Sequence, residues 1–260
     1  MHGQAHPRDR FLTVFGRKPV LEALREEAVD IHQLLLARTA KGDFVEQILN
    51  AARARGVKVR RADPKQVSKL SRHPKQDQGV AMDVIARRMM SLDNWLAEGT
   101  PERGNLLLLD GLTTPANIGI LLRTAVAGGI TGVVIPRSGS PEVGPLVIKA
   151  SAGLAFRAPI LRCSTSHAAA EALAGAGWPL IGLRGHEAED LYTSDFPMRS
   201  VWVLGNETHG VSPAVAAHIS RWARIPMAGN AESLNVATAG AVVVFELLRR
   251  QRSNSATTGA

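Results

Sequence analysis

The sequence predicts an α/β protein of two domains, the second built on a parallel β-sheet. Its 260 residues are enough for two modest domains, and 45 % of them are apolar, which is typical of a globular chain. Short apolar runs alternate with helical patterns along most of the length. Only 4 % of the residues are aromatic, so we expect cores of Leu, Val, Ile and Ala.

The first domain is expected at residues 11–86, after a flexible N-terminus at 1–10. Period-two apolar runs predict its strands and amphipathic spacing predicts its helices. The expected strands are 11–15, 31–36, 57–61 and 79–85, and the expected helices are 17–27, 43–55 and 64–72. This is a small α/β unit of about 80 residues, within the usual size range of a domain.

A linker is expected at 87–104, because Gly99, Pro101 and Gly104 interrupt the pattern. A short helix near 92–96 fits inside it. The second domain follows at 105–251, and a flexible tail at 252–260. Its expected strands are 106–109, 131–135, 156–160, 179–183, 201–204 and 222–225, and its expected helices are 117–127, 145–153, 166–174, 212–219 and 233–251. Apolar strands that alternate with helices predict a parallel sheet covered on both faces.

Such sheets bind ligands at the carboxyl ends of their strands. Three loops that follow predicted strands are rich in Gly, Asn and small polar residues. They are Asp110–Ala125, Gly205–Gly210 and Pro226–Val236. We expect them to meet at one edge of the sheet.

Charge is distributed unevenly. Residues 1–90 carry the whole net charge of +8, and residues 91–260 are neutral. A basic first third is typical of a protein that binds a polyanion, although a merely solvated basic surface explains the charge equally well. The single cysteine, Cys163, excludes an internal disulfide. With no apolar run long enough for a bilayer and no signal-peptide pattern, a cytoplasmic protein without a membrane partner is expected.

Common nucleotide and metal signatures are missing. Gly-Lys does not occur, so there is no P-loop, and no G-x-G-x-x-G opens a helix after a strand. The eight histidines are scattered, and His209 has no second ligand near it in the sequence. We therefore expect no metal site and interpret His209 as a loop residue.

The three loops contain ordered motifs that resemble those of the SpoU (TrmH-like) family of RNA 2′-O-methyltransferases. The motifs are Asn117-Ile-Gly-Ile-Leu-Leu-Arg-Thr-Ala125, Leu204-Gly-Asn-Glu-Thr-His-Gly210 and Ile225-Pro-Met-Ala-Gly-Asn-Ala-Glu-Ser-Leu-Asn-Val236. The resemblance covers roughly residues 105–250. It implies an enzyme that transfers a methyl group from S-adenosylmethionine to a ribose 2′-hydroxyl of RNA.

The first domain resembles the L30e-like RNA-binding domain of the same family. The matching stretches are Gly16-Arg-Lys-Pro-Val-Leu-Glu-Ala-Leu24 and Gln78-Gly-Val80. The family often has His before the Gln-Gly pair, where this chain has Asp77. The two-domain layout resembles that of the family's 23S rRNA guanosine 2′-O-methyltransferases. A guanosine of 23S rRNA is therefore the favoured target, and tRNA is the alternative.

The resemblance also implies a deep trefoil knot in the second domain, a rare exception to ordinary chain topology, and a homodimer packed through that domain. It places the methyl donor against Gly205, Ile225 and Leu234. Asn206, Met227 and Asn235 are expected as further contacts.

These residue types suit the donor. Gly205 would allow close backbone approach, and Ile225, Met227 and Leu234 would form an apolar wall. Taken singly, Ile225 and Leu234 fit ordinary core packing as well.

The resemblance makes Arg123 the candidate catalytic residue. A guanidinium stays protonated, so a grip on an RNA phosphate and stabilisation of the developing alkoxide suit it better than proton abstraction. A surface salt bridge is the alternative. Because Leu121, Leu122 and Ala125 surround Arg123, we expect a buried helix in which this Arg needs a partner.

Four further residues are expected at the active-site edge. Glu207 is the candidate partner of Arg123 or a contact to a substrate hydroxyl, with capping of the next helix as the alternative. Asn117 is expected to cap its own helix. Ser233 and Asn235 open the last helix, where capping is again the alternative to a role in the site.

Two rival functions stay open. A non-catalytic RNA-binding protein is disfavoured by the intact Arg123, Glu207, Ser233 and Asn235. A methyltransferase for small molecules or proteins is disfavoured by the basic first domain.

Overall fold

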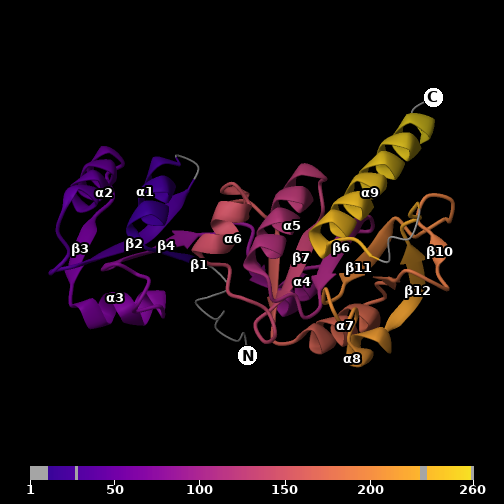
Figure 1. Cartoon of the computed structure of the whole chain (residues 1–260). Coiled ribbons are helices and arrows are strands. Elements are labelled where there is room, and N and C mark those ends of the chain that lie inside the picture. Colours follow the sequence, from indigo (N-terminus) through magenta and orange to yellow (C-terminus); the bar gives the residue numbers. More distant parts are fainter. Residues whose placement is uncertain (1–10, 27–28, 229–232, 259–260) are drawn as a thin grey trace.

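Two β-sheets organise the chain in the computed structural model, which describes residues 11–26, 29–228 and 233–258 (Figure 1). A four-stranded sheet lies at the N-terminal end and an eight-stranded sheet at the C-terminal end. The predicted class, α/β with a parallel sheet in the second part, is confirmed.

The first sheet has the strand order β1-β4-β2-β3. Strand β4 runs antiparallel to both of its neighbours, whereas β2 and β3 are parallel. The strands are β1 (Phe11–Phe15), β2 (Asp30–Ala37), β3 (Val59–Ala62) and β4 (Val80–Ile85), and the helices are α1 (Arg17–Arg25), α2 (Asp43–Ala54) and α3 (Pro64–Ser71). All seven elements lie within a few residues of their predicted positions.

Asp77, the departure from the family pattern, is a buried structural residue. Its carboxylate accepts hydrogen bonds from the hydroxyls of Ser68 and Ser71, at 2.9 and 3.0 Å, and from the backbone N–H of Gly79 at 2.9 Å. These bonds tie the end of α3 to the loop that enters β4. The loop needs this support because Gln78 and Gly79 both have positive φ angles.

The second sheet has the order β10-β12-β9-β11-β6-β7-β8-β5, and every pairing in it is parallel. Its strands are β5 (Met90–Ser91), β6 (Gly104–Leu109), β7 (Gly132–Pro136), β8 (Ile160–Cys163), β9 (Leu180–Leu183), β10 (Glu189–Asp190), β11 (Arg199–Leu204) and β12 (Ile219–Arg224). Its helices are α4 (Leu92–Ala97), α5 (Pro115–Ala127), α6 (Pro145–Ala150), α7 (Ser166–Gly175), α8 (Pro213–Ala216) and α9 (Val236–Thr258).

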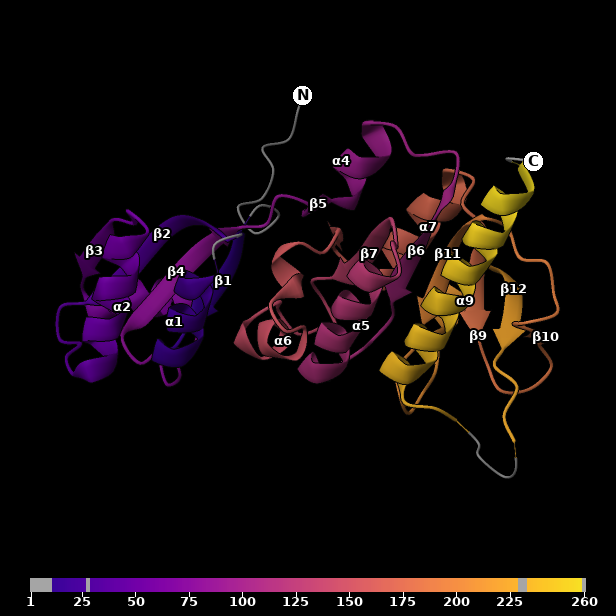
Figure 2. The ribbon, with the colours of Figure 1, turned by 90° about the horizontal axis from the view of Figure 1, so that it is seen from above.

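Both faces of this sheet are covered, as Figure 2 shows from above. Side chains alternate along β6: Leu107 and Leu109 join the core beneath α5, α6 and α9, and Leu106 and Leu108 join a separate core beneath α4, α7 and α8. This explains why the strand reads as an unbroken apolar run.

Two glycines allow α5 to approach its neighbours closely. A Cβ atom at Gly119 would lie 2.5 Å from the Cβ of Ala150 in α6, and one at Gly240 would lie 2.4 Å from a methyl of Leu121. The Gly of the first motif therefore serves helix packing.

The two sheets share one continuous hydrophobic core. It extends from the first unit into α5, α6 and α9. At the junction, Gly144 lies against the ring of Phe15, since a Cβ there would be 3.9 Å from Cε1. Arg157 also pairs with Glu26 at 3.5 Å. The contact with Phe15 places the first unit beside the start of α6, and the exposed Arg157–Glu26 pair lies at the same junction.

Several predicted boundaries in the second part were wrong. Residues 156–160 are not a strand: Leu154–Phe156 forms a short 3-10 helix, and β8 begins only at Ile160. The helix expected at 212–219 is shorter in the structure, where it covers only Pro213–Ala216, because β12 already begins at Ile219. Strand β10, whose two residues give too little periodicity, was missed.

The expected linker and tail are more ordered than predicted. Residues 87–104 contain the predicted short helix as α4, but Met90–Ser91 also pairs with β8 as the edge strand of the second sheet. Helix α9 begins at Val236, not at residue 233, and continues to Thr258, through most of the predicted tail. The N-terminus 1–10 lies outside the described residues.

The expected knot stays a prediction. The path between β12 and α9 includes residues 229–232, which lie outside the described residues. In the part of the chain that the structure describes, no helix is long and apolar enough to cross a membrane.

Candidate functional site

The loops after β6 and β11 meet at the point where the strand order changes direction. The two strands are neighbours, with Leu109 opposite Leu204. From β6 the chain builds outward through β7 and β8, and then crosses to β9 on the far side of β11. Open parallel sheets bind ligands at such switch points, outside the carboxyl ends of the strands.

Hydrogen bonds fix these two loops to each other. The buried carboxylate of Asp110 accepts from the backbone N–H of Ser212 at 2.7 Å and from the hydroxyl of Ser166 at 2.6 Å. The side-chain amide of Asn206 donates to the carbonyl of Gly111 at 2.8 Å. Asp110 and Gly111, at the start of the loop after β6, are therefore bonded to both ends of the loop after β11.

The loop 205–210 also closes on itself. The backbones of Asn206 and Gly210 exchange hydrogen bonds of 2.8 and 2.9 Å. The carbonyl oxygen of the Asn206 side chain accepts from the N–H groups of Thr208 and His209. The backbone and the side chain of Asn206 therefore both hold this loop in its conformation.

Gly205 is required by the protein's own backbone. A Cβ at this position would lie 2.3 Å from the carbonyl carbon of Gly210 and 2.4 Å from the nitrogen of Val211. The sequence argument attributed this glycine to close approach of a ligand. The structure adds a second reason, because the loop itself leaves no room for a side chain; close approach of the donor stays a prediction.

A cavity of about 390 Å³ opens beside this loop. It is bounded by the carboxyl ends of β9, β11 and β12 and by the first turn of α9. Its lining includes seven of the predicted residues: the donor contacts Gly205, Asn206, Ile225, Met227 and Leu234, and Glu207 and Ser233 from the predicted active-site edge. The predicted donor residues are thus brought together, with Asn235 as the exception.

Asn235 lies beside the cavity in a chain of side-chain hydrogen bonds that connects all three motifs. The amide of Asn117 donates to Oε1 of Glu207 at 2.6 Å. The amide of Asn235 donates to the carbonyl oxygen of Asn117 at 3.2 Å. We call Asn117, Glu207 and Asn235 the polar cluster. It joins one residue from each motif at a single point.

The capping predictions come out differently for the two asparagines. Asn235 does cap α9, since its side-chain oxygen accepts from the N–H groups of Ala237 and Thr238, at 2.9 and 3.3 Å. Asn117 does not cap α5. That helix begins at Pro115, after Thr114, so Asn117 lies within the first turn, where it is buried and turned toward Glu207.

Arg123 is exposed, contrary to the expectation of a buried residue. Its neighbours Leu121 and Leu122 are fully buried, but Arg123 lies on the opposite, solvent-facing side of α5 together with Ile120. The expected partner, Glu207, bonds to Asn117 instead. The cavity lining does not include Arg123.

Sequence reasoning missed one wall of the cavity. Leu183, Arg184 and Gly185, at the end of β9, line it together with Thr208. The signal was available, because the strand at 179–183 was predicted and its carboxyl end must share the edge with the others. Its loop lacks the Gly- and Asn-rich composition by which the three loops were chosen.

Four basic side chains of the first unit, Arg55, Lys58, Arg60 and Arg61, differ in what they contact. Arg55 donates to the carbonyls of Ala23, Leu24, Glu26 and Val29, the last at 2.6 Å, and so completes the end of α1. Arg61 donates to the carbonyls of Ala37 and Ala40. These two arginines are structural. Lys58 and Arg60 are exposed, so their charges face solvent.

Within the described ranges, no three His, Cys, Asp or Glu side chains gather as metal ligands would.

Two family profiles match this chain. Residues 104–245 match the SpoU rRNA Methylase family, and residues 13–90 match the RNA 2′-O ribose methyltransferase substrate-binding domain. Among curated proteins, the chain is 32 % identical over 240 residues to the 23S rRNA (guanosine-2′-O-)-methyltransferase RlmB of Xanthomonas axonopodis, covering 92 % of this chain and 96 % of the relative. RlmB of Xylella fastidiosa is 31 % identical over the same shares.

Solved structures with AdoMet are similar across nearly the whole chain. The SpoU methyltransferase AviRb of Streptomyces viridochromogenes, in complex with AdoMet, has a TM-score of 0.63 and 27 % identity, covering 95 % of this chain and 92 % of that one. An AdoMet-bound rRNA methyltransferase of Sinorhizobium meliloti has a TM-score of 0.61 and 26 % identity, covering 93 % and 88 %.

Proposed function

Because this chain belongs to the SpoU rRNA methylase family, we propose that it methylates a guanosine of 23S rRNA and does so as a homodimer. It is an S-adenosylmethionine-dependent RNA 2′-O-methyltransferase, with a substrate-binding domain ahead of the methylase domain. The polar cluster carries the proposal for the site, since it joins the three motifs beside the cavity.

The cavity at the carboxyl edge fits the methyl donor. Its volume of about 390 Å³ lies within the range of small-molecule sites, and it combines apolar walls with polar groups in the way such sites do. We assign Gly205, Ile225, Met227 and Leu234 to the donor. When bound, S-adenosylmethionine supplies a methyl group that is activated by a sulfonium centre.

The polar cluster is suited to hold the acceptor ribose. Asn117 is fixed in one orientation because its amide nitrogen and its carbonyl oxygen are both hydrogen-bonded. The carboxylate of Glu207 is exposed and has further lone pairs for a hydroxyl donor. Alignment of the acceptor with the donor is the main requirement of an in-line displacement.

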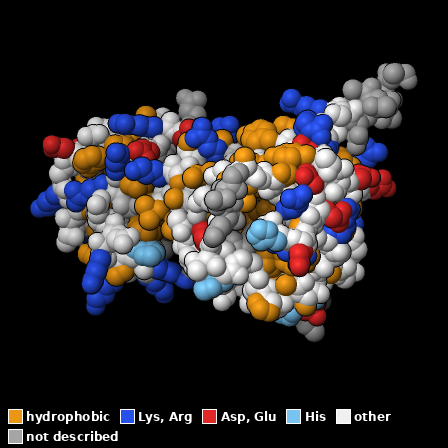
Figure 3. Space-filling model, turned by 45° about the vertical axis from the view of Figure 1, so that its right-hand side comes forward, with side chains coloured by type: hydrophobic (Ala, Val, Ile, Leu, Met, Phe, Trp, Pro, Cys, Tyr) orange, Lys and Arg blue, Asp and Glu red, His pale blue; other side chains and the backbone are white. Residues whose placement is uncertain are grey.

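Arg123 is proposed to act from the other subunit. Its helix face also carries Ile120, 42 % exposed, and α9 beside it exposes half of Phe245. Hydrophobic side chains gather on this upper surface in Figure 3. If two copies pack through α5 and α9, each Arg123 is removed from solvent and carried toward the partner. There its guanidinium would hold a phosphate and stabilise the developing alkoxide.

In vitro methylation tests the substrate. The purified protein, given S-adenosylmethionine with a labelled methyl group, is offered 23S rRNA, 16S rRNA and tRNA from cells that lack the gene. Label should enter 23S rRNA and be recovered as 2′-O-methylguanosine after nuclease digestion. Label in tRNA alone would refute the proposed target, and sedimentation of the same sample tests the dimer.

A further inference from the structure

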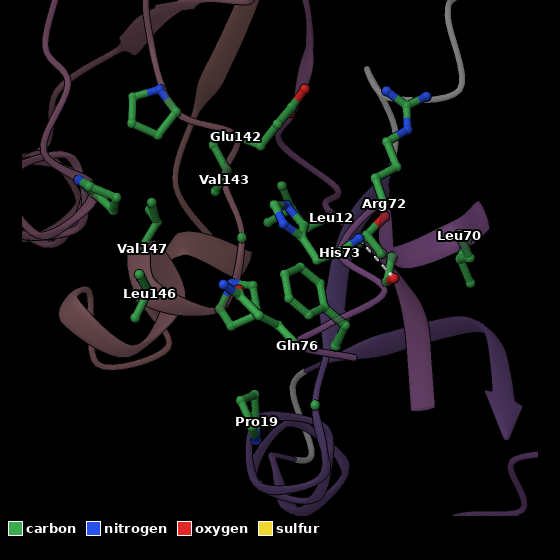
Figure 4. Close-up of a pocket in the computed structure, with 18 of the residues that line it drawn as sticks. Leu12, Pro19, Leu70, Arg72, His73, Gln76, Glu142, Val143, Leu146 and Val147 are labelled. Carbon is green, nitrogen blue, oxygen red and sulfur yellow. Dashed lines mark hydrogen bonds between the residues drawn. The ribbon is translucent and has the colours of Figure 1, made fainter. Parts of the chain in front are cut away.

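A second cavity lies between the two sheets, away from the donor site. Its volume is about 720 Å³, and it is lined by β1, the loop 70–78 and the segment 141–147 that leads into α6. Figure 4 shows Glu142, Val143, Leu146 and Val147 on one side, and Leu12, Pro19, His73 and Gln76 on the other. The cavity thus uses residues of both units.

Stacked aromatic rings and several prolines form part of its wall. The imidazole of His73 stacks on the ring of Phe15, with 4.7 Å between centroids and 19° between planes. The backbone N–H of His73 is held by the hydroxyl of Ser71 at 3.1 Å. Four prolines, in which the ring fixes the φ angle, also line the cavity: Pro19, Pro115, Pro141 and Pro145.

The cavity also leaves apolar surface open to solvent. Leu146 is 67 % exposed at the first turn of α6, although Val147 beside it is fully buried. A large apolar side chain that lines a cavity is a contact point for a ligand, because its burial there is favourable.

Charge around the cavity favours an anion. Lys18 and Arg72 are exposed members of the lining and belong to the unit that carries the net charge of +8. Among the described residues of the lining, the one carboxylate is that of Glu142, and it pairs with Arg162 at 3.6 Å. A flat, apolar and aromatic interior with cations at its edge matches an unpaired nucleotide, whose base is planar and whose phosphate is negative.

The cavity also borders the proposed methylation site. Pro115, part of its lining, is two residues before Asn117 of the polar cluster. Two residues span at most ~7 Å of chain, so this edge of the cavity lies close to the polar cluster. One RNA strand can therefore reach both places.

We propose that this interdomain cavity binds an unpaired base of the RNA substrate near the nucleotide that is methylated, stacked on the outer face of the His73 imidazole, whose inner face rests on Phe15. The inference rests on the proposed function, and it adds a specific base-binding site to it. Stacking is tolerant of base identity, so the cavity selects an unpaired nucleotide beside the target rather than a particular sequence.

A fluorescent single-stranded oligonucleotide tests the cavity. The probe is an eight-nucleotide oligoadenylate with one internal 2-aminopurine, whose fluorescence falls when it stacks. In the full-length protein, His73→Ala should raise the Kd for this probe about 5- to 100-fold, the range expected for loss of one base–aromatic stack. Leu146→Glu, at an exposed position, should weaken binding as well, by placing a negative charge in the cavity.

The matched control is His32→Ala. His32 is also an exposed histidine stacked on a phenylalanine of the same strand as Phe15, namely Phe11, at 4.4 Å; Phe11 reaches the cavity lining, but the His32 imidazole does not. This variant should bind the probe within twofold of the wild type, and all variants should keep the wild-type Kd for S-adenosylmethionine.

Equal probe binding by the wild type, His73→Ala and Leu146→Glu would overturn the proposal, and would mean that the cavity holds residues 1–10, a protein partner or nothing. Failure of the proposed function is a separate result, because it appears as an absence of methyl transfer by the wild type, and probe binding requires no catalysis.

Discussion

Asn117 and Glu207 lie ninety positions apart in the sequence, and a hydrogen bond of 2.6 Å joins their side chains at the edge of the second sheet. The bond connects the first turn of α5 to the loop after β11. Since Asn235 bonds to the same Asn117 from the start of α9, the site depends on three segments that only the folded chain brings together.

Substitutions at Glu207 separate its charge from its hydrogen bond. Glu207→Ala removes the acceptor for Asn117, so we expect kcat to fall about 10- to 100-fold, the equivalent of one charge-assisted hydrogen bond. Glu207→Gln keeps an acceptor oxygen and should retain activity within about fivefold. Steady-state methylation of RNA measures both. If the glutamine variant is as inactive as the alanine variant, the charge itself is required and a purely positioning role is wrong.

Gly205→Ala should lower both the melting temperature and the affinity for S-adenosylmethionine. The new Cβ would overlap the backbone of Gly210, and overpacking of this kind costs about 1–3 kcal/mol. Gly175→Ala is the control, since that glycine lies in α7 with nothing within 4 Å of its Cβ position. Calorimetry and thermal melts check the pair. If the Gly205→Ala protein melts at the wild-type temperature, the loop tolerates a side chain at this position, and the glycine is needed only for close approach of the ligand.

RNA affinity should depend on salt through the solvent-facing charges of the first unit. With three to five phosphates contacted, a plot of log K against log salt has a slope of about −2 to −4. Arg60→Ala should make that slope shallower by about one. Arg55→Ala should leave the slope unchanged and lower the melting temperature, because Arg55 is bonded to backbone carbonyls. Filter binding at several salt concentrations distinguishes them, and identical slopes for Arg60→Ala and wild type would exclude Arg60 from the interface.

Glu246 should make the protein sensitive to acid. Its side chain is 5 % exposed, and the guanidinium groups of Arg249 and Arg250 hold the pKa of this carboxyl below its usual value by hydrogen bonding. Arg250 in turn donates to the carbonyl of Ser194 at 2.9 Å, so the network anchors α9.

A lowered pKa in the folded state stabilises the protein above the pKa of the unfolded state, near 4.5, and this contribution is lost as the pH falls through the folded value. Glu246→Gln should therefore cost about 1–2 kcal/mol at pH 7, and the difference from wild type should shrink below about pH 4. Urea titrations at several pH values measure it, with the exposed Glu22→Gln as control. A constant difference across this range would show that the ionised form is not what matters.

Much of this fold follows from local patterns. All seven elements of the first unit were predicted because apolar alternation and amphipathic spacing are encoded within a few residues. The carboxyl-edge loops were predictable for a related reason, since the place where an apolar strand ends is visible in the sequence.

What failed depends on contacts between distant segments. Arg123 was expected to be buried because its sequence neighbours are apolar, yet α5 packs through Gly119 and Leu121 and leaves Arg123 on its outer side. The edge strand Met90–Ser91 exists only because β8 pairs with it. The role of Gly205 could not be inferred either, because it depends on the return of the chain at Gly210.

Mapping of ribose methylation in cells tests the central claim most directly, namely that the three motifs form one 2′-O-methylation site that needs Arg123. Total RNA is compared from the wild type, from cells lacking the gene, and from the same cells carrying either the intact gene or Arg123→Ala. We predict that one guanosine of 23S rRNA loses its 2′-O-methyl group without the gene, regains it with the intact gene and stays unmethylated with Arg123→Ala, whose activity should fall by about 10²-fold or more. Full methylation restored by the Arg123→Ala gene, or no ribose methyl group lost in its absence, would contradict this account.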